Sequence, residues 1–425
     1  MNDFATLDFL TDSSLIPDPY PYYEYLREQG PAVWVPPHGF VGVTGYDEAL
    51  AVYKNTEDFS SCVALGGPFP PLPFTPEGDD LNAQIDAHRE QFPMFEHMVT
   101  MDPPAHTKAR SLLSRLLTPK RLKENEDFMW RLADRQLDEF IANGRCEFLA
   151  EYAKPFSLIV IADLLGVPER DHQEFRVALG AAQPGSRVGA LDHEPVGTNP
   201  LEFLDEKFSG YLTDRRREPR DDVLTDLATA KYPDGSTPDV IEVVRTATFL
   251  FAAGQETTAK LLSAAIKVIA ERPDITAALR SDRSLIPTFI EESLRLESPV
   301  KSDSRLARRS TRVGGLDVPA GTIVMVLPGA VNRDPSRFAD PNTFDLHRAN
   351  VREHIAFGRG AHSCPGAPLA RVEGRVSLER ILDRMTDIGI DEEFHGPAAA
   401  RTFTYEPTYI LRGLTDIHIG FTPEA

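Results

Sequence analysis

The chain has 425 residues, a formal net charge of −20 at pH 7, 41% hydrophobic residues and 26% charged residues. This composition is typical of a globular protein with a large core, and the acidic charge disfavours binding to nucleic acid or to an anionic membrane surface. Residues 1–4 (MNDF) lack the basic start of a secretory signal, and the longest apolar run, 156–162, is too short to span a bilayer. We therefore expect a cytoplasmic protein without a membrane segment.

Helical patterns dominate the chain, so we predict a mainly α fold. An early helix is expected at 20–27, and short strands follow at 32–35 and 39–43. Residues 62–100 form a long irregular connection, and loops of this length are usually functional. A second irregular region is expected at 181–200.

The second half of the chain adds strands and turns at 300–330 and a β-hairpin that ends near Phe421. No repeat or linker interrupts it, so we expect one domain over 1–425, with a small β-rich lobe at roughly 30–60 and 300–330. The remaining predicted helices are 104–122, 125–143, 155–166, 240–271, 284–297 and 366–386.

The three cysteines, Cys62, Cys146 and Cys364, fit neither a disulfide framework nor a zinc site, because they are odd in number and far apart. Cys364 lies in a glycine-bearing loop, and Pro365 is well placed as the first residue of a helix. A thiolate there would face the positive end of the helix dipole, which suits a nucleophile or a metal ligand. A lone cysteine, however, is more often buried and inert.

The surroundings of this cysteine favour the metal ligand. Segment 357–366 (FGRGAHSCPG) resembles the haem-binding loop of the cytochrome P-450 family. The resemblance implies that Cys364 is the axial ligand of the iron of haem b, that Phe357 packs beside the sulfur, and that Gly358 lets the backbone approach the porphyrin. Pro365 departs from the commoner aliphatic residue and removes one N–H donor near the sulfur.

The predicted helix 240–271 contains AGQETT at 253–258. Alone, such polar residues are usually solvent-facing or bonded to the preceding turn. Beside the cysteine loop, Glu256 and Thr257 resemble the acid–alcohol pair with which the family delivers protons to dioxygen. The resemblance implies that Thr257 hydrogen-bonds the oxygen species, that Glu256 connects it to bulk protons, and that Gly254 leaves room for O₂ in a locally widened helix.

A cationic group matches the haem propionates. His106 and Arg110 are four residues apart and share a helix face, which alone is more often a solvated face. The resemblance implies that both bind propionates together with Arg305 and His362, and arginine suits carboxylates because its planar fork binds them bidentately. We expect Asp303 to orient Arg305.

Glu292 and Arg295 are three residues apart on a predicted helix and would alone form a surface ion pair. With Arg348 they resemble the family's E-x-x-R network, which implies a buried structural cluster on the cysteine side. His354, at the start of the cysteine segment, is also expected to be structural.

The resemblance covers essentially the whole chain and implies a helical triangular prism with small β-sheets. It also implies an O₂-activating monooxygenase of the soluble bacterial type, which takes electrons from a ferredoxin and an NAD(P)H-dependent ferredoxin reductase. We expect a monomer. A local basic patch could steer an acidic ferredoxin, although its members could equally be solvated helix faces. The patch consists of Lys108, Arg110, Arg115, Lys120, Arg121, Arg359, Arg371 and Arg375.

The resemblance implies that aromatic and aliphatic residues surround the distal pocket, which suits a hydrophobic substrate such as a terpenoid, aromatic, steroid or lipid-like molecule. Helical phasing supports Phe249 and Ala253 most, because they lie two turns and one turn from Thr257. Two alternatives stay open: a non-catalytic haem protein that binds or senses a ligand, and a peroxide-driven peroxygenase. The full set of pocket candidates is Phe69, Phe74, Phe249, Ala253, Val300, Tyr409 and Ile410.

Overall fold

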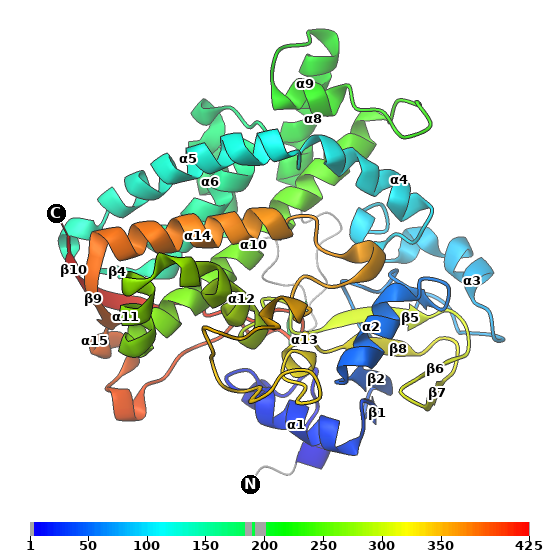
Figure 1. The fold of residues 1–425 in the computed structure, drawn as a ribbon. Helices are drawn as coiled ribbons and strands as arrows, with labels where there is room; N and C mark the ends of the chain where they lie inside the picture. The colour runs from blue at the N-terminus through cyan, green and yellow to red at the C-terminus, as the bar shows by residue number, and fades with distance from the viewer. Residues whose placement is uncertain (1–3, 183–188, 192–200, 425) are drawn as a thin grey trace.

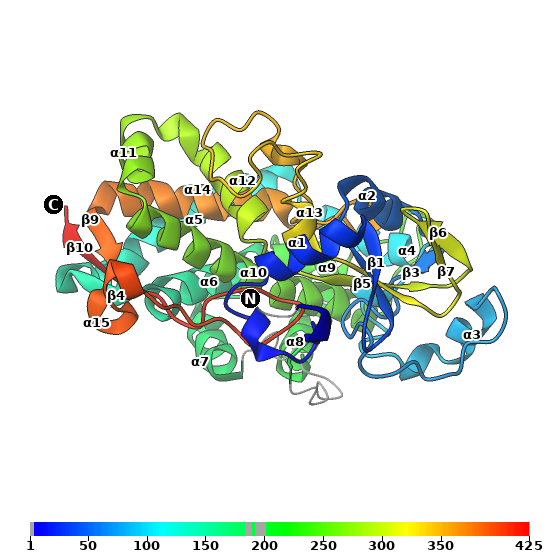
Figure 2. The ribbon, with the colours of Figure 1, turned by 90° about the horizontal axis from the view of Figure 1, so that it is seen from below.

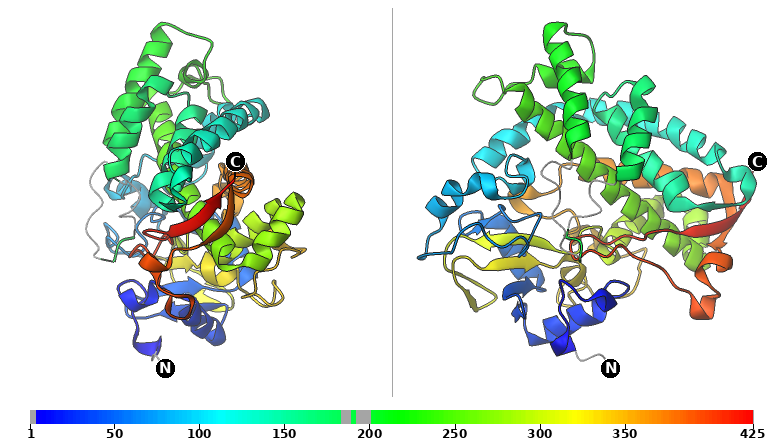
Figure 3. Two further views of the ribbon diagram at one scale, coloured as in Figure 1. Left: turned by 90° about the vertical axis from the view of Figure 1, so that its left-hand side faces the viewer. Right: turned by 180° about the vertical axis from the view of Figure 1, so that it is seen from behind.

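The computed structural model describes residues 4–182, 189–191 and 201–424. The molecule is broad in Figure 1 and narrow when turned on edge in Figure 3, as expected for a prism of helices. Most of its regular structure is helical, which confirms the predicted mainly α fold with small β-sheets. Among the described residues, no helix is both long enough and apolar enough to cross a membrane.

The α-helices are α1 (Tyr20–Gln29), α2 (Tyr46–Lys54), α3 (Asn82–Ala87), α4 (Ala105–Ser111), α5 (Pro119–Asp138), α6 (Lys154–Leu164), α7 (His172–Ala182), α8 (Glu202–Arg217), α9 (Val223–Ala228), α10 (Val240–Glu271), α11 (Pro273–Ser281), α12 (Ile286–Leu296), α13 (Pro328–Val331), α14 (Ala367–Arg384) and α15 (Glu392–His395). The strands are β1 (Ala32–Val35), β2 (Phe40–Val43), β3 (Phe59–Ser60), β4 (Arg145–Glu147), β5 (Asp303–Ala307), β6 (Thr311–Val313), β7 (Leu316–Val318), β8 (Ile323–Val326), β9 (Met385–Ile390) and β10 (His418–Pro423).

Helix α10 runs through the centre of the molecule and packs against α6, α8, α12 and α14 (Figure 1). It begins and ends as predicted, at Val240 and Glu271. A capping box starts it, because Asp239 and Glu242 each accept a backbone N–H of the other. Buried residues occur on several of its faces, as is required of a helix surrounded by other helices.

The boundary between the predicted helices 104–122 and 125–143 lies earlier in the structure than the sequence predicts. Helix α4 ends at Ser111 and continues as a 3₁₀ turn to Arg115, and α5 begins at Pro119. The Thr118 hydroxyl oxygen accepts the N–H of Arg121 at 3.1 Å and caps α5. A capping threonine followed by a proline at the first helical position therefore starts the helix earlier than periodicity predicts.

Two main sheets lie at opposite ends of the molecule (Figure 2). The larger has the order β1-β2-β8-β5-β3, so it joins strands from residues 32–60 with strands from 303–326. The smaller has the order β4-β10-β9. The predicted hairpin ending near Phe421 is wrong, because β10 pairs with β9 across the 27 residues between Ile390 and His418 and also with β4.

A buried charge network ties α12 to the segment that precedes the cysteine loop. Glu292 is fully buried, and its two oxygens accept Nη2 and Nε of Arg295, each at 2.7 Å. Arg348 donates Nε to the same carboxylate at 3.0 Å. Backbone carbonyls take the remaining guanidinium donors, so the second positive charge is solvated by peptide dipoles.

We predict that Glu292→Gln destabilises the protein by about 3–5 kcal/mol, because it leaves two buried guanidinium groups without their anion. Denaturant unfolding of the purified protein measures this change. The control is Asp317→Asn, which breaks an ion pair with Arg312 on an exposed turn and should cost less than about 1 kcal/mol. Equal effects of the two variants would contradict the structural role of the network.

Candidate functional site

The cysteine loop is closed by its own backbone. The N–H of Cys364 donates to the carbonyl of Phe357 at 2.8 Å, and Gly358 adopts φ +62°, a conformation that favours glycine. A side chain at Gly360, at φ +70°, would collide with the carbonyl oxygen of Tyr53. The loop therefore has one conformation available, and that conformation presents Cys364 at the start of α14.

Helix α14 begins later than the sequence predicts. Its first residue is Ala367, with Gly366 as the N-cap, so Pro365 is not the first helical residue. The backbone N–H groups of Gly366 and Ala367 bond toward the sulfur of Cys364. The protein atoms packed around this thiol raise its pKa, although the side chain keeps accessible surface, and these N–H groups together with Arg110 act in the opposite direction. Two donors thus serve the sulfur although Pro365 supplies none.

Accessible space opens at two central positions. Cys62 and Cys146 are buried, but Cys364 is exposed although its loop leads directly into a core helix. Ala253 is likewise exposed near the middle of α10, and α10 packs against α14. Apolar or thiol groups at such positions are normally covered by neighbours. Their exposure fits a large group, such as haem, that would fill the space.

The predicted cationic residues meet at one place. The rings of His106 and His362 lie 3.9 Å apart between centroids, and Arg110 donates to the carbonyl of Ser363 at 2.6 Å. Arg305 acts electrostatically on both histidines. His106 is buried, and neither of its ring nitrogens has a hydrogen-bond partner among the described residues. A buried polar group of this kind is costly, so the site fits a ligand that supplies an acceptor.

The electrostatics of this group favour anions. Burial, together with the positive charges of Arg110 and Arg305, lowers the pKa of His106 to about 4 and that of His362 to about 2. Both imidazoles are therefore neutral at pH 7, and the positive charge resides on the arginines. Arg305 is oriented as predicted, since its Nη1 donates to Asp303 at 2.6 Å. The group suits carboxylates such as haem propionates.

The acid and the alcohol of α10 both have protein partners. The Thr257 hydroxyl donates to the carbonyl of Ala253 at 2.8 Å, which is the back-bonded arrangement. Glu256 accepts Nζ of Lys260 at 2.8 Å, and the same ammonium group donates to Glu406 at 2.6 Å. Glu256 is therefore held in an ion pair, and it is itself more exposed than Lys260 or Glu406.

Gly254 lies where α10 packs against α6. A Cβ at this position would lie 3.4 Å from Ile161 of α6, at the near limit of ordinary van der Waals contact. The role of Gly254 in leaving room for O₂ stays a prediction. Nearby, the Ser157 hydroxyl of α6 donates to the carbonyl of Gln255 at 2.8 Å, which ties the two helices at the height of the acid–alcohol pair.

The structure brings together some of the pocket candidates. Val300 forms a β-bridge with Leu411, and the N–H of Lys301 donates to the carbonyl of Ile410 at 2.8 Å. The Tyr409 hydroxyl donates to the carbonyl of Gly66 at 2.7 Å, so this segment also contacts the long loop. On α10, Phe249 lies beside His97, with ring centroids 6.1 Å apart.

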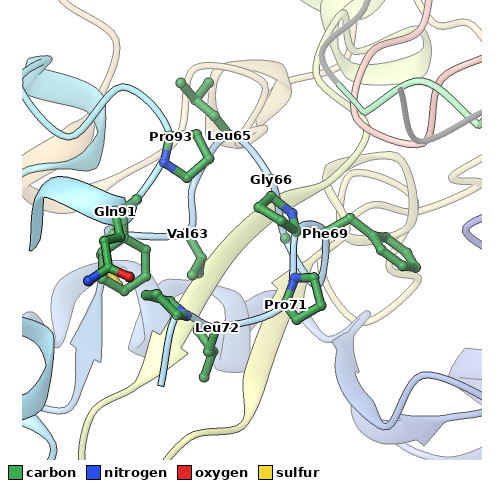
Figure 4. A pocket seen from close by; sticks show the side chains of 13 residues that line it. Val63, Leu65, Gly66, Phe69, Pro71, Leu72, Gln91 and Pro93 are labelled. Carbon is green, nitrogen blue, oxygen red and sulfur yellow. The ribbon is translucent and has the colours of Figure 1, made fainter. Parts of the chain in front are cut away.

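Phe69 and Phe74 are partly buried and pack against the hydrophobic cluster that contains Tyr409 and Ile410. The Phe74 ring packs against His88 and Phe92 within the long loop. The Phe69 ring lies 5.0 Å from that of His38, and Figure 4 shows it pointing away from the other side chains that line the loop cavity. That cavity is about 20 Å³, which is room for about one water molecule and not for an organic substrate. These two phenylalanines pack the loop.

Several residues of the region carry no family motif. Lys260 pairs with both Glu256 and Glu406, and Glu373 of α14 accepts the hydroxyl of Thr258 at 2.8 Å. Glu256 and Lys260 are four residues apart on a helix, so their ion pair could have been predicted from the sequence. Glu373 offers none, because its partner lies 115 residues away.

Most of the expected basic patch is engaged in internal bonds. Lys108 and Lys120 are exposed. The side chain of Arg115 lies outside the described residues. The bonded members are Arg110 with Ser363, Arg121 with Leu164, Arg359 with His354, Arg371 with Glu291 and Arg375 with Glu126.

Comparison with known proteins identifies the class. The family model described as Cytochrome P450 matches residues 196–386. The cytochrome P450 monooxygenase PikC of Streptomyces venezuelae is 33% identical over 419 residues, covering 95% of this chain and 91% of PikC. The substrate-free structure of Mycobacterium marinum cytochrome P450 CYP150A6 is 70% identical, with a TM-score of 0.94 and complete coverage of both chains. CYP109E1 from Bacillus megaterium in complex with testosterone is 27% identical, with a TM-score of 0.78 over 95% of this chain and 99% of that one.

The chain belongs to the cytochrome P450 family, and it is a haem-thiolate monooxygenase that uses O₂ and electrons from a redox partner.

Glu373 generates a pH-dependent prediction. It is buried, and burial raises its pKa to about 8. Because the folded state keeps this proton and the unfolded state does not, Glu373 costs stability increasingly as the pH rises from about 4.5 to about 8. Glu373→Gln, which can still accept the Thr258 hydroxyl, should therefore raise the unfolding temperature relative to wild type near pH 8.5 and change it little near pH 5. Thermal unfolding at both pH values measures this, and a difference that does not depend on pH would contradict it.

Proposed function

We propose that Cys364 is the axial ligand of haem b and that His106, Arg110, Arg305 and His362 bind its propionates. The observation that carries this proposal is the buried His106, whose ring nitrogens have no hydrogen-bond partner among the described residues. Its ring lies against His362 of the cysteine loop, and Arg110 and Arg305 act on it electrostatically. Haem bound there would supply the iron at which O₂ is reduced and one of its atoms is inserted into substrate. Phe357 and Gly358 would form the cradle under the porphyrin.

The protein's own contribution to this chemistry lies on α10. Thr257 would present its hydroxyl to the reacting oxygen, and Glu256 would pass protons to Thr257 without opening the pocket to solvent. The exposed Ala253, whose carbonyl accepts the Thr257 hydroxyl, supports this placement. Glu292, Arg295 and Arg348 would act only as a scaffold beneath the cysteine loop.

We predict that Thr257→Ala increases the peroxide released per NAD(P)H consumed by roughly tenfold, because protons no longer reach the distal side in order. The assay supplies a ferredoxin and its reductase and measures peroxide and NAD(P)H together. The matched control is Thr246→Ala, since Thr246 is another threonine of α10 whose hydroxyl bonds the carbonyl four residues earlier, at 3.0 Å. Identical coupling in the two variants would show that Thr257 has no part in proton delivery.

The substrate is proposed to be a hydrophobic small molecule of the terpenoid, aromatic, steroid or lipid-like class. Phe249, Ala253, Val300 and Ile410 offer apolar surface around the distal side, and Tyr409 offers a ring. The testosterone complex of CYP109E1 shows that a related protein of this fold holds a steroid. Titration with testosterone and a panel of terpenes and fatty acids should give a high-spin Soret shift with at least one class, and charged hydrophilic compounds should give none.

The redox partner is proposed to be a ferredoxin reduced by an NAD(P)H-dependent reductase, and the protein is proposed to act in the cytoplasm as a monomer. The exposed Lys108 and Lys120 support an acidic partner. A non-catalytic sensor or a peroxide-driven enzyme would have no need for the acid–alcohol pair. Either would show unchanged coupling in Thr257→Ala, so the same assay separates them from the monooxygenase.

A further inference from the structure

A lysine of α10 lies between two carboxylates from distant parts of the chain. Lys260 Nζ donates to Glu256 Oε1 at 2.8 Å and to Glu406 Oε2 at 2.6 Å. The Lys260 side chain is 4% exposed, against 12% for Glu406 and 20% for Glu256. The three groups form a graded series from the core of the molecule toward its surface, and we call them the Lys260 cluster.

The fold is shaped around this lysine. Gly413 packs so closely on its methylene stem that any side chain at position 413 would collide with it. Glu406 is in turn held by the segment that carries Tyr409, because the N–H of Glu406 donates to the carbonyl of Gly413 at 3.0 Å. The contact is therefore enclosed on both sides, unlike an ion pair on a solvated helix face.

The charges of the cluster do not cancel. Two carboxylates share one ammonium group, so the cluster carries one negative charge in excess. Burial raises the pKa of Glu406, Lys260 opposes this rise, Glu256 adds to it, and Lys154 of α6 opposes it. Glu406 thus binds a proton more readily than a solvated glutamate does, and the neighbouring cations oppose this binding.

We propose that Lys260 and Glu406 are positioning residues for Glu256. Glu406 competes with Glu256 for the Lys260 ammonium group, and this competition controls when the Glu256 carboxylate is free to turn toward Thr257. This inference rests on the proposed proton-delivery role of Glu256 and Thr257. It goes beyond it by placing the control of delivery in residues that do not touch the haem or the substrate.

The physical reason is competition for one ammonium group. To pass a proton to Thr257, Glu256 must give up its bond to Lys260. Without a second partner, the buried Lys260 cation would then be unpaired, which is costly. Glu406 keeps Lys260 paired at that moment and so lowers the cost of the movement. A proton bound at Glu406 weakens its hold on the lysine, which then pairs more strongly with Glu256.

The two substitutions should therefore act in different ways. Glu406→Gln removes the competing charge, so Glu256 is held more tightly and NAD(P)H consumption with ferredoxin and reductase should fall by roughly tenfold, with a larger solvent deuterium isotope effect. Lys260→Met fills the same volume but removes the cation. The infrared band of a protonated carboxylic acid in the haem-loaded protein should then persist to higher pH than in wild type, because Lys260 no longer lowers the pKa of Glu406. Lys260→Arg should restore the wild-type titration.

A matched control lies on the same helix. Lys267 pairs with Glu271 at 3.1 Å, also four residues apart, so Lys267→Met breaks an equivalent ion pair two turns further along. It should alter neither the isotope effect nor the infrared titration. If Glu406→Gln and Lys260→Met behave like Lys267→Met in both measurements, the inference is overturned. Failure of the proposed function is separate: failure of proton delivery through Thr257 would appear as unchanged coupling in Thr257→Ala, and a wrong iron ligand as loss of the thiolate-type carbon monoxide spectrum in the wild-type protein.

Discussion

The Cys364 sulfur keeps accessible surface although its loop leads into the core helix α14. The elements around this loop must hold it in place. The loop of Cys364 is closed by the bond from its N–H to Phe357, and its sulfur is served by the N–H groups of Gly366 and Ala367. The buried carboxylate of Glu292 ties α12 to the segment leading into that loop, and α10 packs against the helix that follows it. The rest of the site follows from this arrangement, because the exposed Cys364 precedes α14 and the exposed Ala253 lies on α10, which packs against α14.

The parts that could be predicted from sequence are those with a local physical signal. The bounds of α10 follow from its apolar periodicity and its capping box, both of which are written within a few residues. The same holds for β1 and β2, whose β-branched runs are short and bounded by turn residues. The meeting of His106 with His362 and of Glu292 with Arg348 came from family resemblance, since spacing alone cannot bring together residues so far apart in the chain.

The remaining features depend on tertiary neighbours. Gly254 lies next to Ile161 of α6, and nothing near Gly254 in the sequence shows this neighbour. The partners of β10 were missed because pairing is decided by the whole sheet. The pairing of Lys260 with Glu406 joins residues 146 positions apart, so the sequence near Glu256 does not show that its lysine is shared with a second acid.

The central claim is that the Cys364 sulfur is the protein ligand of the haem iron. It is tested most directly by the spectrum of the dithionite-reduced protein with carbon monoxide, recorded for wild type and for Cys364→Ser. The account predicts the red-shifted Soret band of a thiolate ligand in wild type and its loss in the variant, with folding checked by circular dichroism. A wild-type band at the position typical of an imidazole ligand, or an unchanged band in Cys364→Ser, would contradict it.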